Sequence, residues 1–384
     1  MARVLQVVTE LVVGGATLSM LDVAEDLAGE HEVLVAHGLL DDPGNAAARR
    51  ARARFPTYEL PRLARPIDIR NDLAAARACA ALCRHVRPDV IHTHSSKAGI
   101  IGRLAAPGGT VRFHTIHGWG HTPLDPPLTR YLLVNAERLA ALRTTKLIAV
   151  SQDVRDQGLA QNIGRPHQYA VISAPVDMRP HAPDYERARA KARAELKLPE
   201  DADVVGWVGR FSPQKAPLTL VAVLKQLIAE RHNAYAVLIG DGPLRSDVEL
   251  ELHDEITERR VGLTGVRSDV RALYPAFDVL LHTSFWEGDP RVVCEALAER
   301  VPVITARVGG TGFISQDLRL GREVEPGDTD AYIAALESVL DVAELRAPVE
   351  ESALESLRAT DREPYRLTRE LYAIALAQAH REHP

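Results

Sequence analysis

The stretch FDVLLHTSFWEGDPRVVCEALAERVPVIT, residues 277–305, holds two short apolar runs separated by a polar loop and a helical pattern. Asp289 followed by Pro290 is a good pair for an N-cap and a first helical position, so we predict a helix from about Pro290 to Glu299. Apolar runs of four to six residues that alternate with helices are typical of parallel sheets covered on both faces. The stretch therefore predicts one strand–helix–strand unit of an α/β protein.

The same alternation recurs along most of the 384 residues. This length favours two domains, and a segment rich in proline and charge marks a boundary near residue 175. We predict an N-terminal domain over 1–175, a second domain over 176–365, and an amphipathic helix over 366–384 that packs back on the N-terminal domain. Both domains are expected to be doubly wound, Rossmann-like parallel sheets that face each other across a cleft, where ligands bind beyond the strand ends. The predicted strands are 4–8, 32–36, 89–93, 111–116, 146–150 and 169–173, then 204–209, 235–240, 261–265, 278–283 and 301–305.

Composition excludes several classes of protein. Hydrophobic residues form 46% of the chain and charged residues 26%, which argues against a disordered protein. No apolar run approaches the roughly 18 residues of a spanning helix, and the first run is expected to be a buried strand rather than a signal peptide. Three cysteines are too few for a disulfide framework and suit a reducing cytoplasm; Cys79 and Cys83 are interpreted as small buried residues.

Charge divides unevenly along the chain, whose net charge is −6. Residues 1–180 carry 21 lysines and arginines against 17 acidic residues. This balance permits weak peripheral contact of the N-terminal domain with a membrane, although an arginine-rich solvated face explains it more simply. No nucleic-acid motif is present, and 5% aromatic residues offer no stacking platform. We therefore expect no nucleic-acid partner and a cytoplasmic protein, located there or at the inner face of the membrane.

Candidate binding residues gather in loops that follow the predicted strands of the second half. Arg210 and Lys215 flank the Ser-Pro turn of RFSPQK, where two cations beside a helix start suit a diphosphate, although surface cations at helix starts are common. Backbone groups of Thr264, Gly265 and Val266 could meet a nucleobase. Glu287 lies in the loop of the opening stretch and Glu295 in its helix; alone, an acid early in a helix is more often a solvated partner of the helix dipole.

Taken together, these motifs resemble a known family. The series GRFSPQK, VLIGDGPL, VGLTGVRSDV and FDVLLHTSFWEGDPRVVCEALAERVPVITARVGG, in this order, resembles the retaining glycosyltransferases of family 4, which have the GT-B fold. The first half agrees through VVGGA, IHTHSSKAGIIGRLAA, TIHGW, LIAVSQDVRD and VISAPVD. The most specific part is the pair of glutamates, Glu287 and Glu295, with seven residues between them.

The resemblance implies a role for each matched position. Arg210 and Lys215 would hold the donor diphosphate, Glu295 would bind the ribose hydroxyls, and Glu287 would contact the transferred sugar. His117 would contact the sugar and acceptor. Further donor contacts are implied for Gly14, Gly15, Thr264, Gly265, Val266, Gly288, Asp289, Pro290 and Arg291.

Some positions depart from the family pattern or fit it loosely. Asp-Pro-Arg replaces the commoner Phe-Gly-Leu-Pro after Glu287-Gly288, Thr17 stands where Glu is frequent, and Arg307 stands where Asp is frequent. These departures leave the identity of the donor sugar open. Lys97, Trp119 and His121 are weaker candidates for the acceptor region. His92, His94 and His114 alternate in a way that is more typical of a sheet face than of a metal site, so no metal is expected.

We therefore predict an enzyme that moves a hexose or N-acetylhexosamine from a nucleotide-diphosphate sugar to an acceptor hydroxyl with retention of configuration. A UDP-sugar is the favoured donor, ahead of GDP-mannose, and no cofactor is expected. The acceptor stays open among a lipid-linked sugar, a glycan and a small metabolite, in polysaccharide, glycolipid or natural-product biosynthesis. Two alternatives are a sugar-nucleotide epimerase of similar fold and a non-catalytic nucleotide-sugar-binding protein.

Overall fold

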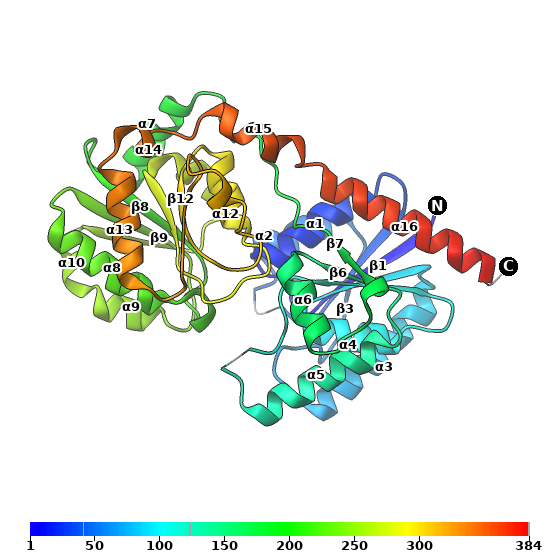
Figure 1. Ribbon diagram of the computed structural model, residues 1–384. Coiled ribbons are helices and arrows are strands. Elements are labelled where there is room, and N and C mark those ends of the chain that lie inside the picture. Colours follow the sequence, from blue (N-terminus) through cyan, green and yellow to red (C-terminus); the bar gives the residue numbers. More distant parts are fainter. Residues whose placement is uncertain (41, 123, 383–384) are drawn as a thin grey trace. The chain divides into compact units, whose positions relative to one another are not determined.

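The computed structural model describes residues 1–40, 42–122 and 124–382. The chain divides into two compact units, which we call unit 1 (residues 1–175 and 362 onward) and unit 2 (residues 176–361). Each unit has its own parallel sheet with helices on both faces, so the α/β prediction is confirmed (Figure 1).

The described part of unit 1 contains a parallel sheet of seven strands in the order β3-β2-β1-β4-β5-β6-β7. Order reverses between β1 and β4, where Leu5 pairs with Ile91 and Val7 with Thr93. Its strands are β1 Arg3–Val8, β2 Glu32–His37, β3 Thr57–Glu59, β4 Val90–His94, β5 Val111–Ile116, β6 Lys146–Ala149 and β7 Tyr169–Val171. Its helices are α1 Gly15–Leu27, α2 Ala46–Arg54, α3 Ile69–Val86, α4 Ser96–Ala105, α5 Pro127–Ala141, α6 Gln152–Ala160, the 3-10 turn η1 Pro166–Gln168, and α16 Glu363–Glu382.

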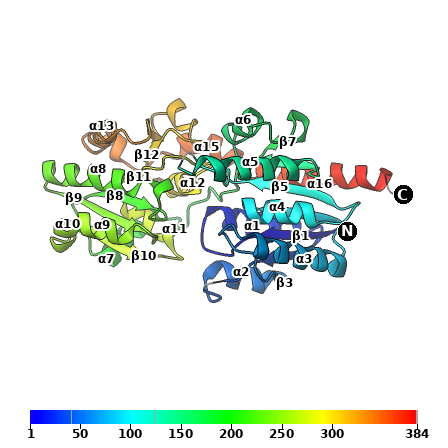
Figure 2. The same ribbon diagram turned by 90° about the horizontal axis from the view of Figure 1, so that it is seen from below.

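Apolar clusters cover both faces of the unit 1 sheet, as its near-continuous apolar strands require. One cluster joins Met20 and Leu21 of α1 to Tyr372 of α16, and Arg369 of α16 forms an ion pair with Asp26 at 2.7 Å. The opposite cluster contains the buried cysteines of α3. Helix α4 packs between α3 and α5 in the layer that Figure 2 shows.

The described part of unit 2 contains a parallel sheet of six strands in the order β10-β9-β8-β11-β12-β13, which again reverses once, between β8 and β11. Its strands are β8 Asp203–Val208, β9 Ala234–Ile239, β10 Val261–Gly265, β11 Val279–His282, β12 Val303–Ala306 and β13 Gly321–Val324. Its helices are α7 Tyr185–Leu196, α8 Pro217–Glu230, α9 Arg245–Glu251, α10 His253–Thr257, α11 Val270–Leu273, α12 Arg291–Ala298, α13 Thr329–Leu340, α14 Ala343–Arg346 and α15 Glu351–Ala359, with 3-10 turns η2 Pro213–Lys215, η3 Tyr274–Ala276 and η4 Ile314–Gln316.

Every predicted strand is present within about two residues of its predicted bounds, and β5 and β10 match them fully. The two missed strands, β3 and β13, are short strands at sheet edges, where few apolar residues are needed. Within the described residues, none of the helices combines the length and apolar character that crossing a bilayer requires.

Candidate active site

The loops after β8 and β11 meet in unit 2, because these strands are neighbours at the point where strand order reverses. The amide of Phe285 donates to the carbonyl of Gln214 at 2.8 Å, and the Thr283 hydroxyl donates to the carbonyl of Lys215 at 2.9 Å. These bonds hold one loop against the other. Residues far apart in sequence, around Lys215 and Glu287, are thereby placed side by side.

Lys215 and Glu287 form a partly buried ion pair at the centre of this site, with side chains 19% and 10% exposed. The hydroxyl of Ser284 donates to the same Glu287 oxygen, Oε1, at 2.8 Å. Gln214 donates to Oε2 at 3.3 Å and to the carbonyl of Trp286 at 3.0 Å. The carboxylate therefore accepts hydrogen bonds from three side chains, and Oε1 is the more heavily occupied oxygen.

The environment of Glu287 keeps it ionised. Burial alone raises the pKa of this carboxyl, but the charge of Lys215, the nearby ring of His282 at 3.6 Å and the hydrogen bond from Lys215 outweigh burial and lower the pKa to about 2. His282 bonds Thr305 through Nδ1 and Ser284 through Nε2, both at 2.9 Å. Burial lowers the pKa of His282, so this histidine is neutral at pH 7 and supports the site by hydrogen bonding.

Arg210 follows β8 and differs from Lys215 in its surroundings. It is exposed, and within the described residues its guanidinium makes no hydrogen bond or ion pair. A guanidinium with five donors can bind phosphate oxygens in a bidentate manner. The site thus offers one positioned ammonium and one unengaged guanidinium, which is chemistry suited to a dianionic leaving group.

Helix α12 begins one residue later than predicted. Pro290 occupies the N-cap position with φ −77° and ψ 95°, and Arg291 is the first helical residue. Because the ψ angle of Pro290 is extended, Asp289 lies outside the helix, so its assignment as N-cap was wrong. Asp289 instead packs against Gly310, where φ is +80° and an added Cβ would lie 2.8 Å from an Asp289 oxygen.

Glu295 lies on α12 with its side chain 15% exposed. Arg291, one turn earlier, approaches it at 3.4 Å, and the buried hydroxyl of Tyr274 donates to Oε2 at 3.4 Å. Both contacts are long. The carboxylate is therefore positioned by weak contacts that leave it capacity to accept further hydrogen bonds.

The end of β10 lies two strands away from β8 in the same sheet. The carbonyl of Gly265, whose φ is +73°, accepts from the amide of Gly240 at 2.9 Å. Thr264 precedes it, and the side chain of Val266 is 64% exposed. Thr264, Gly265 and Val266 thus lie at the carboxyl edge of unit 2, the same edge as Lys215 and Glu287.

The glycines predicted to bind the donor lie at the start of α1 in unit 1. Gly14 precedes the helix with φ 177°, an angle that any residue adopts, and an added Cβ there would meet no atom within 4 Å. Gly15 is the first helical residue. The packing of the chain therefore does not require glycine at position 14.

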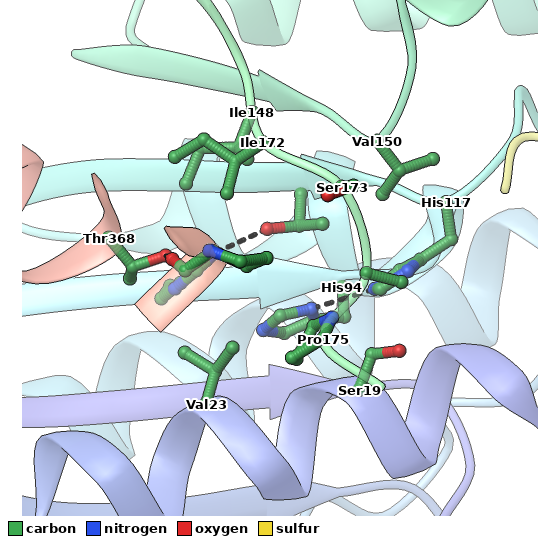
Figure 3. A pocket seen from close by; sticks show the side chains of 14 residues that line it. Ser19, Val23, His94, His117, Ile148, Val150, Ile172, Ser173, Pro175 and Thr368 are labelled. Atoms are coloured by element: carbon green, nitrogen blue, oxygen red, sulfur yellow. Dashed lines mark hydrogen bonds between the residues drawn. The ribbon is translucent and has the colours of Figure 1, made fainter. Parts of the chain in front are cut away.

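His117 follows β5 and is linked to the core of unit 1 through a chain of side chains. His94 bonds His117 Nε2 through Nδ1 at 3.1 Å (Figure 3). Its Nε2 bonds the oxygen of Gln6 at 2.8 Å. Burial lowers the pKa of His94 well below its usual value, so this ring is neutral and carries one proton. If Nε2–H of His94 donates to the Gln6 oxygen, Nδ1 must accept from His117, and the tautomer of His117 is set from the core.

The three strand histidines have different hydrogen-bond partners, although the ring centres of His92 and His94 lie 4.4 Å apart. His92 bonds Tyr372 of α16 and Thr115, both at 2.7 Å. His114 points to the opposite face, where an added Cβ on Gly99 would lie 2.4 Å from its ring. In the described part of the chain, no group of three or more His, Cys, Asp or Glu side chains is placed to hold a metal ion.

The residues predicted for the acceptor region make internal contacts. Lys97 donates to Asp72 at 2.7 Å and to the carbonyl of Pro66, so its charge is neutralised within unit 1. Trp119 donates from Nε1 to the carbonyl of Val154 at 3.0 Å and packs on α6. His121 is buried beside Trp119, with ring centres 5.9 Å apart. Lys97 is therefore held by an acidic partner within unit 1.

Two cavities have neither Lys215 nor Glu287 among the described residues that line them. One, of about 20 Å³, borders His94 and His117 in unit 1 (Figure 3), which is room for a single water molecule. The other, of about 410 Å³, lies in unit 2 along α7 and α11, and the described residues that line it include none predicted to bind the donor. Neither cavity marks the donor site.

Comparison with known proteins defines the class of this fold. Solved structures superpose along nearly the whole chain: HepE of Anabaena in complex with UDP and glucose has a TM-score of 0.77 at 22% identity and covers 98% of this chain and 100% of its own. Sucrose-phosphate synthase of Thermosynechococcus elongatus has a TM-score of 0.76 at 22% identity over 97% and 100% of the two chains. The fold is therefore that of the GT-B glycosyltransferases.

Sequence comparison then shows the family. The profile of glycosyl transferases group 1 matches residues 188–355, and that of glycosyltransferase family 4 matches residues 13–179. The chain is 30% identical over 289 residues to the UDP-Gal:alpha-D-GlcNAc-diphosphoundecaprenol alpha-1,3-galactosyltransferase of Escherichia coli, which covers 74% of each chain. It is also 30% identical over 285 residues to the D-inositol 3-phosphate glycosyltransferase 2 of Catenulispora acidiphila, covering 70% of this chain and 66% of that one. The chain belongs to glycosyltransferase family 4 and is a glycosyltransferase.

Several side chains of the site were not found from the sequence. Gln214, His282 and Ser284 surround Glu287, yet each looked like an ordinary loop or strand-end residue. Their one signal was position, since all three lie within a few residues of the carboxyl ends of β8 and β11. Gln6 was missed because a polar residue inside a buried strand is visible only once its partner, His94, is known.

Proposed function

We propose that the protein is a retaining glycosyltransferase that moves a hexose or N-acetylhexosamine from a UDP-sugar to an acceptor hydroxyl. The observation that carries the proposal is the Lys215–Glu287 pair, with an Arg210 guanidinium that has no partner among the described residues, at the carboxyl edge where the strand order of unit 2 reverses. In this proposal both cations bind the donor diphosphate, whose negative charge grows as the bond to the sugar breaks.

The proposed roles of the other residues follow from their positions. Glu295 accepts hydrogen bonds from the ribose, Thr264 to Val266 meet the base, and the backbone from Gly288 to Arg291 approaches the sugar. Glu287 contacts the sugar through Oε2, its less occupied oxygen. His117, Gly14 and Gly15 are assigned to the sugar and phosphates.

Retention of configuration is proposed to need no nucleophile from the protein. Glu287 is ionised, but its oxygens are hydrogen-bonded to Lys215, Ser284 and Gln214, which lowers its reactivity toward an anomeric carbon. The departing phosphate, held by Arg210 and Lys215, instead takes the proton of the acceptor hydroxyl on the same face of the sugar.

Names of similar proteins support the choice of donor and acceptor. The Escherichia coli relative is named for UDP-galactose and a diphosphoundecaprenol-linked sugar, and HepE was crystallised with UDP and glucose. We therefore propose UDP as the donor nucleotide and a lipid-diphosphate-linked sugar as the acceptor class. The epimerase alternative has no observation on the described residues in its favour.

The test is a thermal-shift panel of UDP, GDP, ADP and TDP, followed by transfer assays with the UDP-sugars. A nucleotide at about 100 times its dissociation constant adds roughly 2.7 kcal/mol of stability, which is readily measured. A shift with UDP alone is expected. A shift with GDP alone would overturn the donor assignment, and hydrolysis or epimerisation of the sugar with no transfer to any acceptor would overturn the reaction.

A further inference from the structure

Helix α5 of unit 1 has two apolar sides, only one of which packs on the protein. Val134, Ala140 and Ala141 are buried against unit 1. On the other side, five large side chains are between 55% and 77% exposed. Four of these side chains follow the first one by 3, 4, 11 and 14 residues. In a helix with 3.6 residues per turn, these spacings place all five on one side. We call them the α5 apolar stripe: Leu128, Tyr131, Leu132, Leu139 and Leu142.

The stripe is part of a wider apolar surface. Leu124, just before α5, is 66% exposed. Ile67, Ile69 and Leu73, at the start of α3, are 58%, 75% and 52% exposed. Helices α3 and α5 flank α4 in one layer (Figure 2), so both groups belong to the same helical face of unit 1. Single exposed leucines are ordinary, but nine large apolar side chains exposed on or beside one helical layer mark an interaction surface.

The charges around the stripe are positive. From residue 124 to residue 143 the chain has three arginines and two acids, and one of the acids, Glu137, is buried against Arg103 at 2.5 Å. Arg130 and Arg143 are exposed and have no acidic partner in the described chain. Arg138 donates to the carbonyl of Gln161 at 2.9 Å and keeps its charge.

We infer that unit 1 docks on an anionic lipid bilayer through the α5 apolar stripe. An apolar helical side flanked by arginines, with a tyrosine among the leucines, matches the interface of a membrane with acidic headgroups. A symmetric dimer through the same surface fits less well, because it would bring the arginines of one copy close to those of the other without acids between them.

Docking through α5 has a consequence for the reaction. Helix α3 follows strand β3, and helix α5 follows strand β5. Both helices therefore begin at the carboxyl edge of the parallel sheet of unit 1, the edge that carries His117. A bilayer on this surface would lie beside that edge. This consequence rests on the proposed lipid-linked acceptor, whereas the docking itself does not.

The test is flotation of the full chain with vesicles of phosphatidylcholine alone or with 30% phosphatidylglycerol, without donor or acceptor. Binding is expected to the anionic vesicles and to weaken when salt rises from 0.1 M to 0.5 M. Leu128→Ser with Leu132→Ser is expected to lower the partition constant at least about tenfold. The matched control is Leu218→Ser with Leu250→Ser, which changes leucines 54% and 75% exposed in unit 2 and should leave binding unchanged.

A second pair of substitutions separates charge from apolar contact. Arg130→Gln with Arg143→Gln is expected to reduce binding to anionic vesicles severalfold and to remove most of its dependence on salt. Melting temperature and UDP binding of every variant serve to show that it is folded.

Three results would overturn the inference: no flotation of the wild type with anionic vesicles, equal losses in the stripe variant and its control, or a dimer in sedimentation velocity that the stripe substitutions convert to monomer. The last would identify a second copy as the occupant. A wild type that binds vesicles but transfers no sugar would contradict the proposed function and leave the docking intact.

Discussion

Replacing Lys215 with methionine tests the central ion pair, because it removes the cation and leaves Glu287 in place. Glu287 is 10% exposed, and its pKa of about 2 lies well below the ordinary value of 4.5. A difference of this size corresponds to about 3 kcal/mol of stability. Since the folded pKa is lowered, this contribution is present above pH 4.5 and is lost as pH falls toward 2. Lys215→Met should therefore cost unit 2 at least about 3 kcal/mol at pH 7.

In the variant the sign of the pH dependence should reverse. Without Lys215, burial becomes the dominant influence and raises the pKa of Glu287 above 4.5. When the pKa of a carboxyl is higher in the folded than in the unfolded protein, the free energy of unfolding falls as pH rises between the two pKa values. Lys215→Met should therefore be less stable above pH 4.5 than below it, whereas the wild type is more stable above pH 4.5. The double variant Lys215→Met with Glu287→Gln, which leaves no buried charge, should regain most of the loss.

Urea denaturation between pH 4 and pH 8, followed by tryptophan fluorescence, measures these differences. A Trp119→Phe background leaves Trp207 and Trp286, both in unit 2, as the reporters. The control is Lys225→Met, which breaks an exposed pair with Glu251 at 3.9 Å and should cost less than about 0.5 kcal/mol. Equal stability of Lys215→Met and wild type across this pH range, or no recovery in the double variant, would refute the reasoning.

Four further predictions concern binding and turnover. Arg210→Ala should lower turnover by about 10²–10³ with no change in melting temperature, whereas Arg187→Ala, an exposed cation on α7, should change neither; an equal loss in both would contradict the assignment. Glu295→Gln should weaken UDP binding roughly tenfold but hardly affect 2′,3′-dideoxy-UDP, as calorimetry would show; equal losses for both ligands would remove the ribose contact. Gly14→Ala should melt like the wild type, because an added Cβ meets no atom of the protein, yet it should lose turnover, because that Cβ would occupy the space proposed for the donor. Gly108→Ala, which has similar space around it, should keep its turnover. A fully active Gly14→Ala would exclude a ligand from that space. EDTA should leave transfer unchanged, and a loss restored by magnesium would show that a metal takes part.

The local folding units were predictable because their causes are local. A buried parallel strand needs four or more consecutive apolar residues, so strands such as 111–116 and 261–265 are visible in the sequence. Edge strands lack this requirement, which is why Thr57–Glu59 and Gly321–Val324 were missed. The start of α12 was misplaced by one residue because Pro290 has an extended ψ angle, which local sequence does not reveal. Asp289, just before it, packs against Gly310 instead of capping the helix.

The site was predictable only in part, because spacing reports which residues share a loop but not which side chains pair. Lys215 and Glu287 were both identified, yet their ion pair depends on the adjacency of β8 and β11, a property of strand order. Lys97 shows the same limit: its position after a strand was visible in the sequence, but its ion pair with Asp72 of α3 was not. Partners that come from another element cannot be read from a single stretch of chain.

The pairing of Lys215 with Glu287 orients the cation without using it up. A lysine ammonium has three donors, and Glu287 takes one of them, so two remain for phosphate oxygens. Glu287 in turn is held by Ser284 and Gln214, which fixes the ammonium at a defined place before any donor binds. Arg210 has no such partner among the residues that the structure describes, so it must be ordered by the ligand at a cost in side-chain entropy. The two cations should therefore differ in what their loss affects: Lys215 contributes to both folding and turnover, and Arg210 to turnover alone.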